Sequence, residues 1–115
     1  MIVFDIAKVA PGLNTLLRLH WRGRHAMQKI WDKILWEERV QIPARQWPIE
    51  HAAIRITRHS LHTLDHDNLN GSAKIVLDAL KHANIIADDS PAHIDLKITQ
   101  CRGKPRTLIH IEALP

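Results

Sequence analysis

The sequence predicts a single small α+β domain over residues 1–115, in which two helices pack on a mixed β-sheet. Four short segments alternate apolar and polar residues, which is the pattern of half-buried strands. Two further segments repeat apolar residues at spacings of three and four, which is the pattern of helices buried on one face. The resulting order is strand, helix, strand, helix, strand, strand. Strands on either side of each helix, followed by a closing hairpin, favour helices packed on one sheet.

The first half of the chain contains one strand, one helix and a second strand. The first strand is expected over Ile2–Ile6, and Pro11-Gly12 ends the segment that follows it. A helix is expected from Met27, and it should stop before Pro43. Its apolar positions are Ile30, Trp31, Ile34 and Leu35. The second strand is expected around Ile54–Ile56.

The second half contains the more strongly patterned helix. Its apolar stripe is Leu69, Ala73, Val76, Leu77 and Leu80. Ser72 is expected to cap its first turn, and Asn84 stands where a left-handed residue is tolerated after a helix. Two strands then follow, around Ile94–Ile98 and Ile109–Ile111. A basic loop, Arg102-Gly103-Lys104-Pro105, joins them as a hairpin.

Charge and cysteine content limit the partners and the compartment. Lys and Arg number 16 against 12 Asp and Glu, a net charge of +4, and six of the acids lie between Asp65 and Asp95. The remaining surface is therefore more basic than the total indicates, which suits a polyanionic partner. The lone Cys101 excludes an internal disulfide and favours a reducing compartment. Because no apolar run approaches the ~20 residues of a membrane span, we expect a cytoplasmic protein without a membrane partner.

Two acidic pairs flank the second helix, Asp65 with Asp67 and Asp88 with Asp89. A dozen helical residues span about 18 Å, so the pairs meet only if the chain doubles back after Asn84. Four converging carboxylates would need a cation between them. Hard oxygen ligands without a nearby cysteine favour Mg²⁺, with Mn²⁺ as a substitute, over Zn²⁺. The alternative is ordinary turn chemistry, since Asp and Asn are frequent in loops.

Basic residues gather in two places. Lys74 stands four residues before Asp78, so it forms either an ion pair on the helix surface or a contact to a scissile phosphate. A second basic stretch has no acid between Lys8 and Trp31, which favours phosphate contacts over a merely solvated face. Its charged residues are Arg18, His20, Arg22, Arg24, His25 and Lys29. Within it, Trp21 either stacks on exposed bases or belongs to the core, whereas Trp31 and Trp36 are assigned to packing.

Several of these elements fall in the order of a known family. Asp65-x-Asp67-Asn68-Leu69, then Lys74 before Asp78-Ala79-Leu80, then Asp88-Asp89, resembles the signature of RusA-type Holliday junction resolvases. Pro11-Gly12-Leu13-Asn14 is similar to that family's loop after the first strand. The chain departs from the family at Asn70-Gly71-Ser72-Ala73, which lengthens the connection to Lys74.

The resemblance implies a homodimeric, magnesium-dependent endodeoxyribonuclease of bacterial or prophage origin. Such an enzyme cuts four-way junctions and other branched DNA in recombination and repair, leaving a 5′-phosphate and a 3′-hydroxyl. The catalytic residues would be Asp65, Asp67, Asp89 and Lys74, with Asp88 as a further metal ligand. DNA contacts are expected at Asn14, Arg18, Arg22, Arg24 and Lys29. The alternatives are a preference for flaps or other branched DNA, and a non-catalytic DNA-binding module of phage origin.

Overall fold

A computed structural model describes residues 1–42 and 47–115 and confirms the α+β class. The elements are β1 (Ile2–Ile6), α1 (Leu13–Arg18), α2 (Trp21–Val40), β2 (Ala52–Ser60), α3 (His66–His82), β3 (Ile94–Arg102) and β4 (Arg106–Ala113). The short helix α1 was not expected, because its six residues are too few for an apolar repeat to register.

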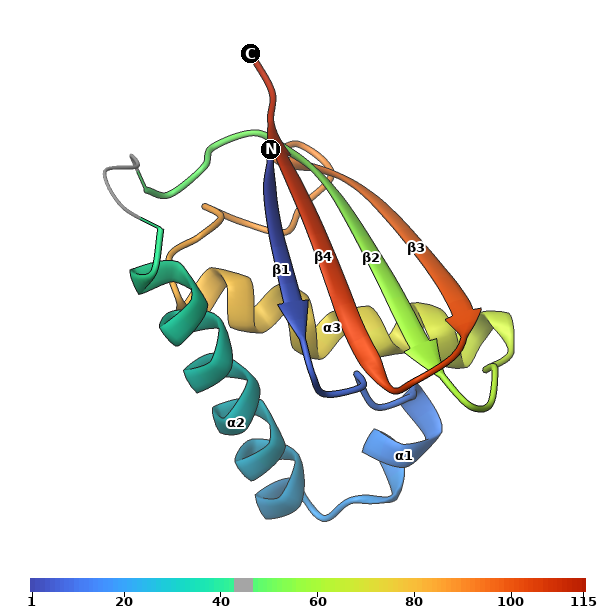
Figure 1. Cartoon of the computed structure of the whole chain (residues 1–115). Coiled ribbons are helices and arrows are strands. Elements are labelled where there is room, and N and C mark those ends of the chain that lie inside the picture. Colours follow the sequence, from blue (N-terminus) through green and yellow to red (C-terminus); the bar gives the residue numbers. More distant parts are fainter. Residues whose placement is uncertain (43–46) are drawn as a thin grey trace.

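The four strands form one mixed sheet in the order β1-β4-β2-β3. β2 and β3 are parallel, whereas β4 runs antiparallel to both β1 and β2. The predicted hairpin of the last two strands was wrong, because β2 lies between β3 and β4 and the loop after Arg102 crosses over it. Figure 1 shows α3 crossing behind the strands, with α2 beside it. Alternate strand residues face these helices and are buried: Ile2, Phe4, Ile6, Ile54, Ile56, Ile109 and Ile111. The alternation therefore places the core between the sheet and the two long helices.

Helix α2 begins at Trp21, six residues before the predicted start, because its first turns carry charged residues that hide the apolar repeat. It ends at Val40, in agreement with a stop before Pro43, which itself lies outside the described residues.

Trp31 of α2 is buried as expected. Assigning Trp36 to packing was wrong, because the side chain is 50% exposed on the outer side of α2 with the Arg39 guanidinium 4.8 Å from its ring. In the ranges described, no helix combines the length and apolarity needed to cross a membrane.

Helix α3 is the most deeply packed helix, and it starts about two turns earlier than a cap at Ser72 predicts. Asp65 is its N-cap, since the Asp65 side chain accepts a hydrogen bond from the Asn68 backbone N–H. Ser72 is instead buried inside the helix, where its hydroxyl donates to the Leu69 carbonyl. Asn84 has a φ of 58°, which confirms the left-handed residue expected after the helix.

The first turns of α3 support α1. The segment Asn70-Gly71-Ser72-Ala73, which lengthens the chain before Lys74, is a continuous part of α3 and adds about one helical turn. Gly71 lies directly under Leu13 of α1, where a Cβ at position 71 would overlap the Leu13 Cβ. The absence of a side chain at Gly71 therefore lets α1 dock on α3.

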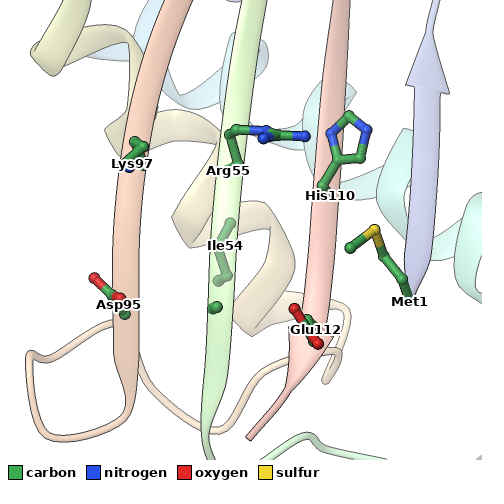
Figure 2. Close-up of a pocket in the computed structure, with 8 residues that line it drawn as sticks. Met1, Ile54, Arg55, Asp95, Lys97, His110 and Glu112 are labelled. Carbon is green, nitrogen blue, oxygen red and sulfur yellow. The ribbon is translucent and has the colours of Figure 1, made fainter.

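The other face of the sheet is left uncovered by the helices (Figure 1). Figure 2 shows the Arg55 side chain of β2 directed toward His110 of β4, with Lys97 on the neighbouring β3. In the neighbouring row of the same face, two residues before Arg55, Ala53 lies between Asp95 of β3 and Glu112 of β4. Positive and negative side chains thus occupy adjacent rows, so this face offers no surface of a single sign to a polyanion.

We predict that Gly71→Ala destabilises the protein although it replaces glycine with a better helix former. Replacing glycine with alanine at an open helix position stabilises the helix by up to ~1 kcal/mol. At position 71 the new Cβ would overlap the Leu13 Cβ, so α1 must shift. The free energy of unfolding should fall by ~1–3 kcal/mol in urea melts. Gly103→Ala, with no atom within 4 Å of the new Cβ, is the control and should change stability by less than ~0.5 kcal/mol. A stabilised Gly71→Ala would contradict the docking described.

Candidate nucleic-acid and metal site

The acidic pair Asp65 and Asp67 lies at the N-terminal end of α3. Asp65 Oδ1 accepts from the Asn68 backbone N–H at 2.9 Å, and Asp65 Oδ2 accepts from Asn68 Nδ2 at 3.1 Å. Asp67 is exposed in the first turn. Carboxylates are favoured at this end of a helix, because the unpaired backbone N–H groups carry partial positive charge. The helix therefore holds two carboxylates one residue apart, facing solvent.

Asn68 connects this acidic pair to α1. Its side-chain oxygen accepts a hydrogen bond of 2.8 Å from the Asn14 backbone N–H, while its amide nitrogen donates to Asp65. One amide group thus fixes the start of α1 and the orientation of Asp65 together. In the sequence, Asn68 stood out only because it follows Asp67. The hydrogen bond to Asn14 could not be predicted from the sequence.

Asp89 lies in the loop between α3 and β3, and its carboxylate joins a cluster with Lys74, Asp78 and Lys81 of α3. Lys81 Nζ is 3.2 Å from Asp89 Oδ1, and Lys74 Nζ is 3.6 Å from Asp89 Oδ2. Both lysines also approach Asp78 Oδ1, Lys74 at 3.0 Å and Lys81 at 3.7 Å. Of the two interpretations of Lys74, the i,i+4 ion pair is therefore present in the structure, and Asp89 extends it.

The charges in this cluster shift each other's protonation. The hydrogen bond from Lys74 to Asp78, followed by the charges of Asp78 and Asp89, raises the pKa of Lys74 above its ordinary value in spite of some burial. Partial burial opposes ionisation of Asp89, but the hydrogen bond and charge of Lys81 together with the charge of Lys74 hold the pKa of Asp89 below its usual range. Asp89 is therefore ionised and Lys74 protonated at neutral pH.

The two acidic pairs remain apart. The chain turns after Asn84 as expected, but the turn brings Asp89 to Lys74 and Lys81. Lys74 is nine residues after Asp65, which corresponds to about 14 Å along the helix. Asp88 is half-buried beside Asp89. Over the part of the chain that the structure describes, no three His, Cys, Asp or Glu side chains form a group able to hold a metal ion.

The donor chemistry of Asp65 and Asp67 nevertheless fits a magnesium ion. Protein-bound Mg²⁺ usually has one or two carboxylate ligands and completes its shell with water and substrate phosphates. Each Asp65 oxygen accepts one hydrogen bond from Asn68 and retains a further lone-pair site. Two carboxylates with free lone pairs therefore match an ion that is shared with a bound phosphate.

The predicted DNA-contacting residues lie on α1 and on the first turns of α2. We call residues 18–29 the basic arm. Its cations are exposed at the last turn of α1 and along α2: Arg18, Arg22, Arg24 and Lys29. Arg24 Nη1 donates to the Leu19 carbonyl at 2.8 Å, and this bond secures the junction between the two helices. Asn14 is exposed in the first turn of α1.

The basic arm and Lys74 share a surface. A cavity of about 160 Å³ between α1, α2 and α3 is lined by Leu16, Arg24, Gln28, Lys74 and Ile75. Gln28 Nε2 donates to the Ile75 carbonyl at 3.0 Å, which fixes α2 against α3 beside this cavity. Two cations from different helices therefore border one depression with an apolar floor.

No protein-family model matches the chain, and no curated protein matches it.

We predict that the Asp89→Asn variant loses less stability in acid than the wild type does. The pKa of Asp89 is lower in the folded than in the unfolded chain, so its ionised form stabilises the fold above about pH 4. That contribution disappears as the pH falls through the lowered, folded-state pKa. Between about pH 5 and pH 2 the melting temperature of Asp89→Asn should fall by about 2–4 °C less than that of the wild type.

The control for this experiment is Asp95→Asn, which removes an exposed carboxylate on the uncovered sheet face. Its melting temperature should follow the wild-type pH profile. Parallel profiles for wild type and Asp89→Asn would show that the two lysines do not stabilise the Asp89 carboxylate.

Proposed function

We propose that this chain is a magnesium-dependent endodeoxyribonuclease that cuts branched DNA. The observation that carries the proposal is the packing of the basic arm along α3, the helix whose N-terminal end holds Asp65 and Asp67. Asn14 of α1, the helix that leads into the arm, is hydrogen-bonded to Asn68, and Arg24 and Lys74 border the same cavity further along α3. A phosphate backbone lying on the arm would therefore be directed along α3 toward the acidic pair.

Asp65 and Asp67 are the residues that would hold the ion, together with a phosphate oxygen of the DNA. When bound, Mg²⁺ lowers the pKa of a bound water and offsets negative charge at the reacting phosphorus. Asn68 orients Asp65 through two hydrogen bonds, so this carboxylate is positioned before any ligand arrives. Arg18, Arg22, Arg24 and Lys29 would neutralise neighbouring phosphates and set the register of the strand.

Lys74 would supply positive charge to the phosphate backbone further along α3. Its raised pKa keeps it protonated across the physiological range, so it acts as a cation and not as a proton donor. Asp89 fixes the Lys74 ammonium group together with Asp78. To join Asp65 and Asp67 at an ion, Asp89 must first leave Lys74 and Lys81. A homodimer would present two such sites to the symmetric strands of a four-way junction.

A second candidate function is a DNA-binding module without catalysis. The observation that favours it is the separation of Asp89 from Asp65 and Asp67, with Asp89 already neutralised by two lysines. Such a module would keep the basic arm and its salt-dependent affinity for DNA. It would bind branched DNA equally well with and without Mg²⁺, and it would leave the strands intact.

We predict that the wild type cuts a synthetic four-way junction with Mg²⁺ or Mn²⁺ and that Asp65→Asn and Asp67→Asn each lower the cleavage rate by roughly 100-fold or more. Asparagine caps a helix as well as aspartate does, so Asp65→Asn retains the start of α3 while it removes the charge. Cleavage is followed on denaturing gels with labelled strands.

Asp95→Asn is the matched control and should cut at the wild-type rate, because Asp95 lies on the uncovered sheet face. Wild-type rates for Asp65→Asn and Asp67→Asn would remove the acidic pair from catalysis. Tight junction binding by the wild type without cleavage in either metal would favour the DNA-binding module.

A further inference from the structure

Trp21, the first residue of α2, is 57% exposed. Leu17, at the end of α1, is 64% exposed. Tryptophan is usually well buried, and exposing its ring forgoes a large hydrophobic gain. An exposed tryptophan at the junction of two helices is therefore a candidate for a binding surface.

An arginine and a histidine lie against Trp21. The Arg22 guanidinium lies 5.2 Å from the centre of its ring, and the His20 ring lies 5.6 Å away. Trp21 stands inside the basic arm, and no acid occurs between Lys8 and Trp31. Trp36 offers a contrast on the same helix: it is similarly exposed, but it is followed directly by Glu37 and Glu38.

The backbone that carries Trp21 is fixed on both sides. His20 caps α2, since its Nδ1 accepts a hydrogen bond from the Arg22 backbone N–H. Arg24 reaches back to the Leu19 carbonyl at 2.8 Å and ties the first turn of α2 to the end of α1. A residue held in this way pays little conformational entropy when a planar ligand covers its ring.

We infer that Trp21 is a stacking platform for an unpaired base of the DNA, while Arg18 and Arg22 contact the phosphates on either side of that base. Aromatic side chains in a basic groove bind single strands in this way, because every base has a face on which a ring can stack. Bases in an intact duplex are covered by their neighbours, whereas a branch point or a single-stranded segment leaves faces open. The inference rests on the proposed binding of DNA by the basic arm, and it adds a preference for DNA with unstacked bases.

The test compares two oligonucleotides of equal length and charge, an oligothymidylate and the same backbone with abasic sites throughout. Binding is measured by fluorescence anisotropy in EDTA, so that cleavage does not enter. The wild type should bind the oligothymidylate roughly 5- to 100-fold more tightly than the abasic strand. Trp21→Leu should lose this difference and keep the affinity for the abasic strand. Trp21→Phe should restore part of the difference, which a purely structural role would not predict.

Trp36→Leu is the matched control, because it removes a similarly exposed tryptophan from the same helix next to Glu37 and Glu38. It should keep the full preference for the oligothymidylate. Base-dependent binding that survives in Trp21→Leu, or that disappears in Trp36→Leu, would overturn the inference. If the wild type binds a four-way junction and binds both single strands with equal affinity, stacking by Trp21 is ruled out, whereas the proposed binding of DNA is retained. If it binds none of them, the proposed function falls as well.

Discussion

The docking of α1 on the first turns of α3 is the contact on which the rest of the candidate site depends. Gly71 provides the space for Leu13, and the Asn68 side chain then bridges Asn14 and Asp65. Without this contact, α1 and the first residue of the basic arm, Arg18, would lose their fixed position relative to the acidic pair. The extra turn of α3 at residues 70–73 is therefore a structural requirement of this chain, since it contains the glycine that receives α1.

Helix α3 divides its charges into two groups with different properties. At its N-terminal end, Asp65 and Asp67 face solvent, and Asp65 accepts a backbone N–H hydrogen bond that leaves carboxylate lone pairs available to a cation. Further along, Lys74 and Lys81 neutralise Asp78 and Asp89. The first group is open to a divalent ion, and the second presents a lysine that remains protonated. This separation supports an arrangement in which ion and lysine act on one phosphate backbone from different positions.

Much of the fold could be predicted because its signals are local. Alternation located the strands, the stripe from Leu69 to Leu80 located α3, and the spacing of Lys74 and Asp78 gave their ion pair. The start of α3 was missed because Ser72 and Asp65 are both acceptable caps, and the apolar stripe begins only at Leu69. The position of Asp89 was beyond sequence reasoning, because it depends on the path of the loop after Asn84 and on long-range ion pairs.

Paramagnetic broadening of backbone amide signals by Mn²⁺ tests most directly the claim that the N-terminal end of α3 is the divalent-ion site beside the basic arm. Mn²⁺ is titrated in substoichiometric amounts into the ¹⁵N-labelled protein without DNA, so that cleavage does not enter. We expect broadening centred on the amides of residues 65–69 and on the amide of Asn14, which Asn68 holds nearby. Broadening centred on Asp88 and Asp89, with sharp signals at residues 65–69 and Asn14, would contradict it.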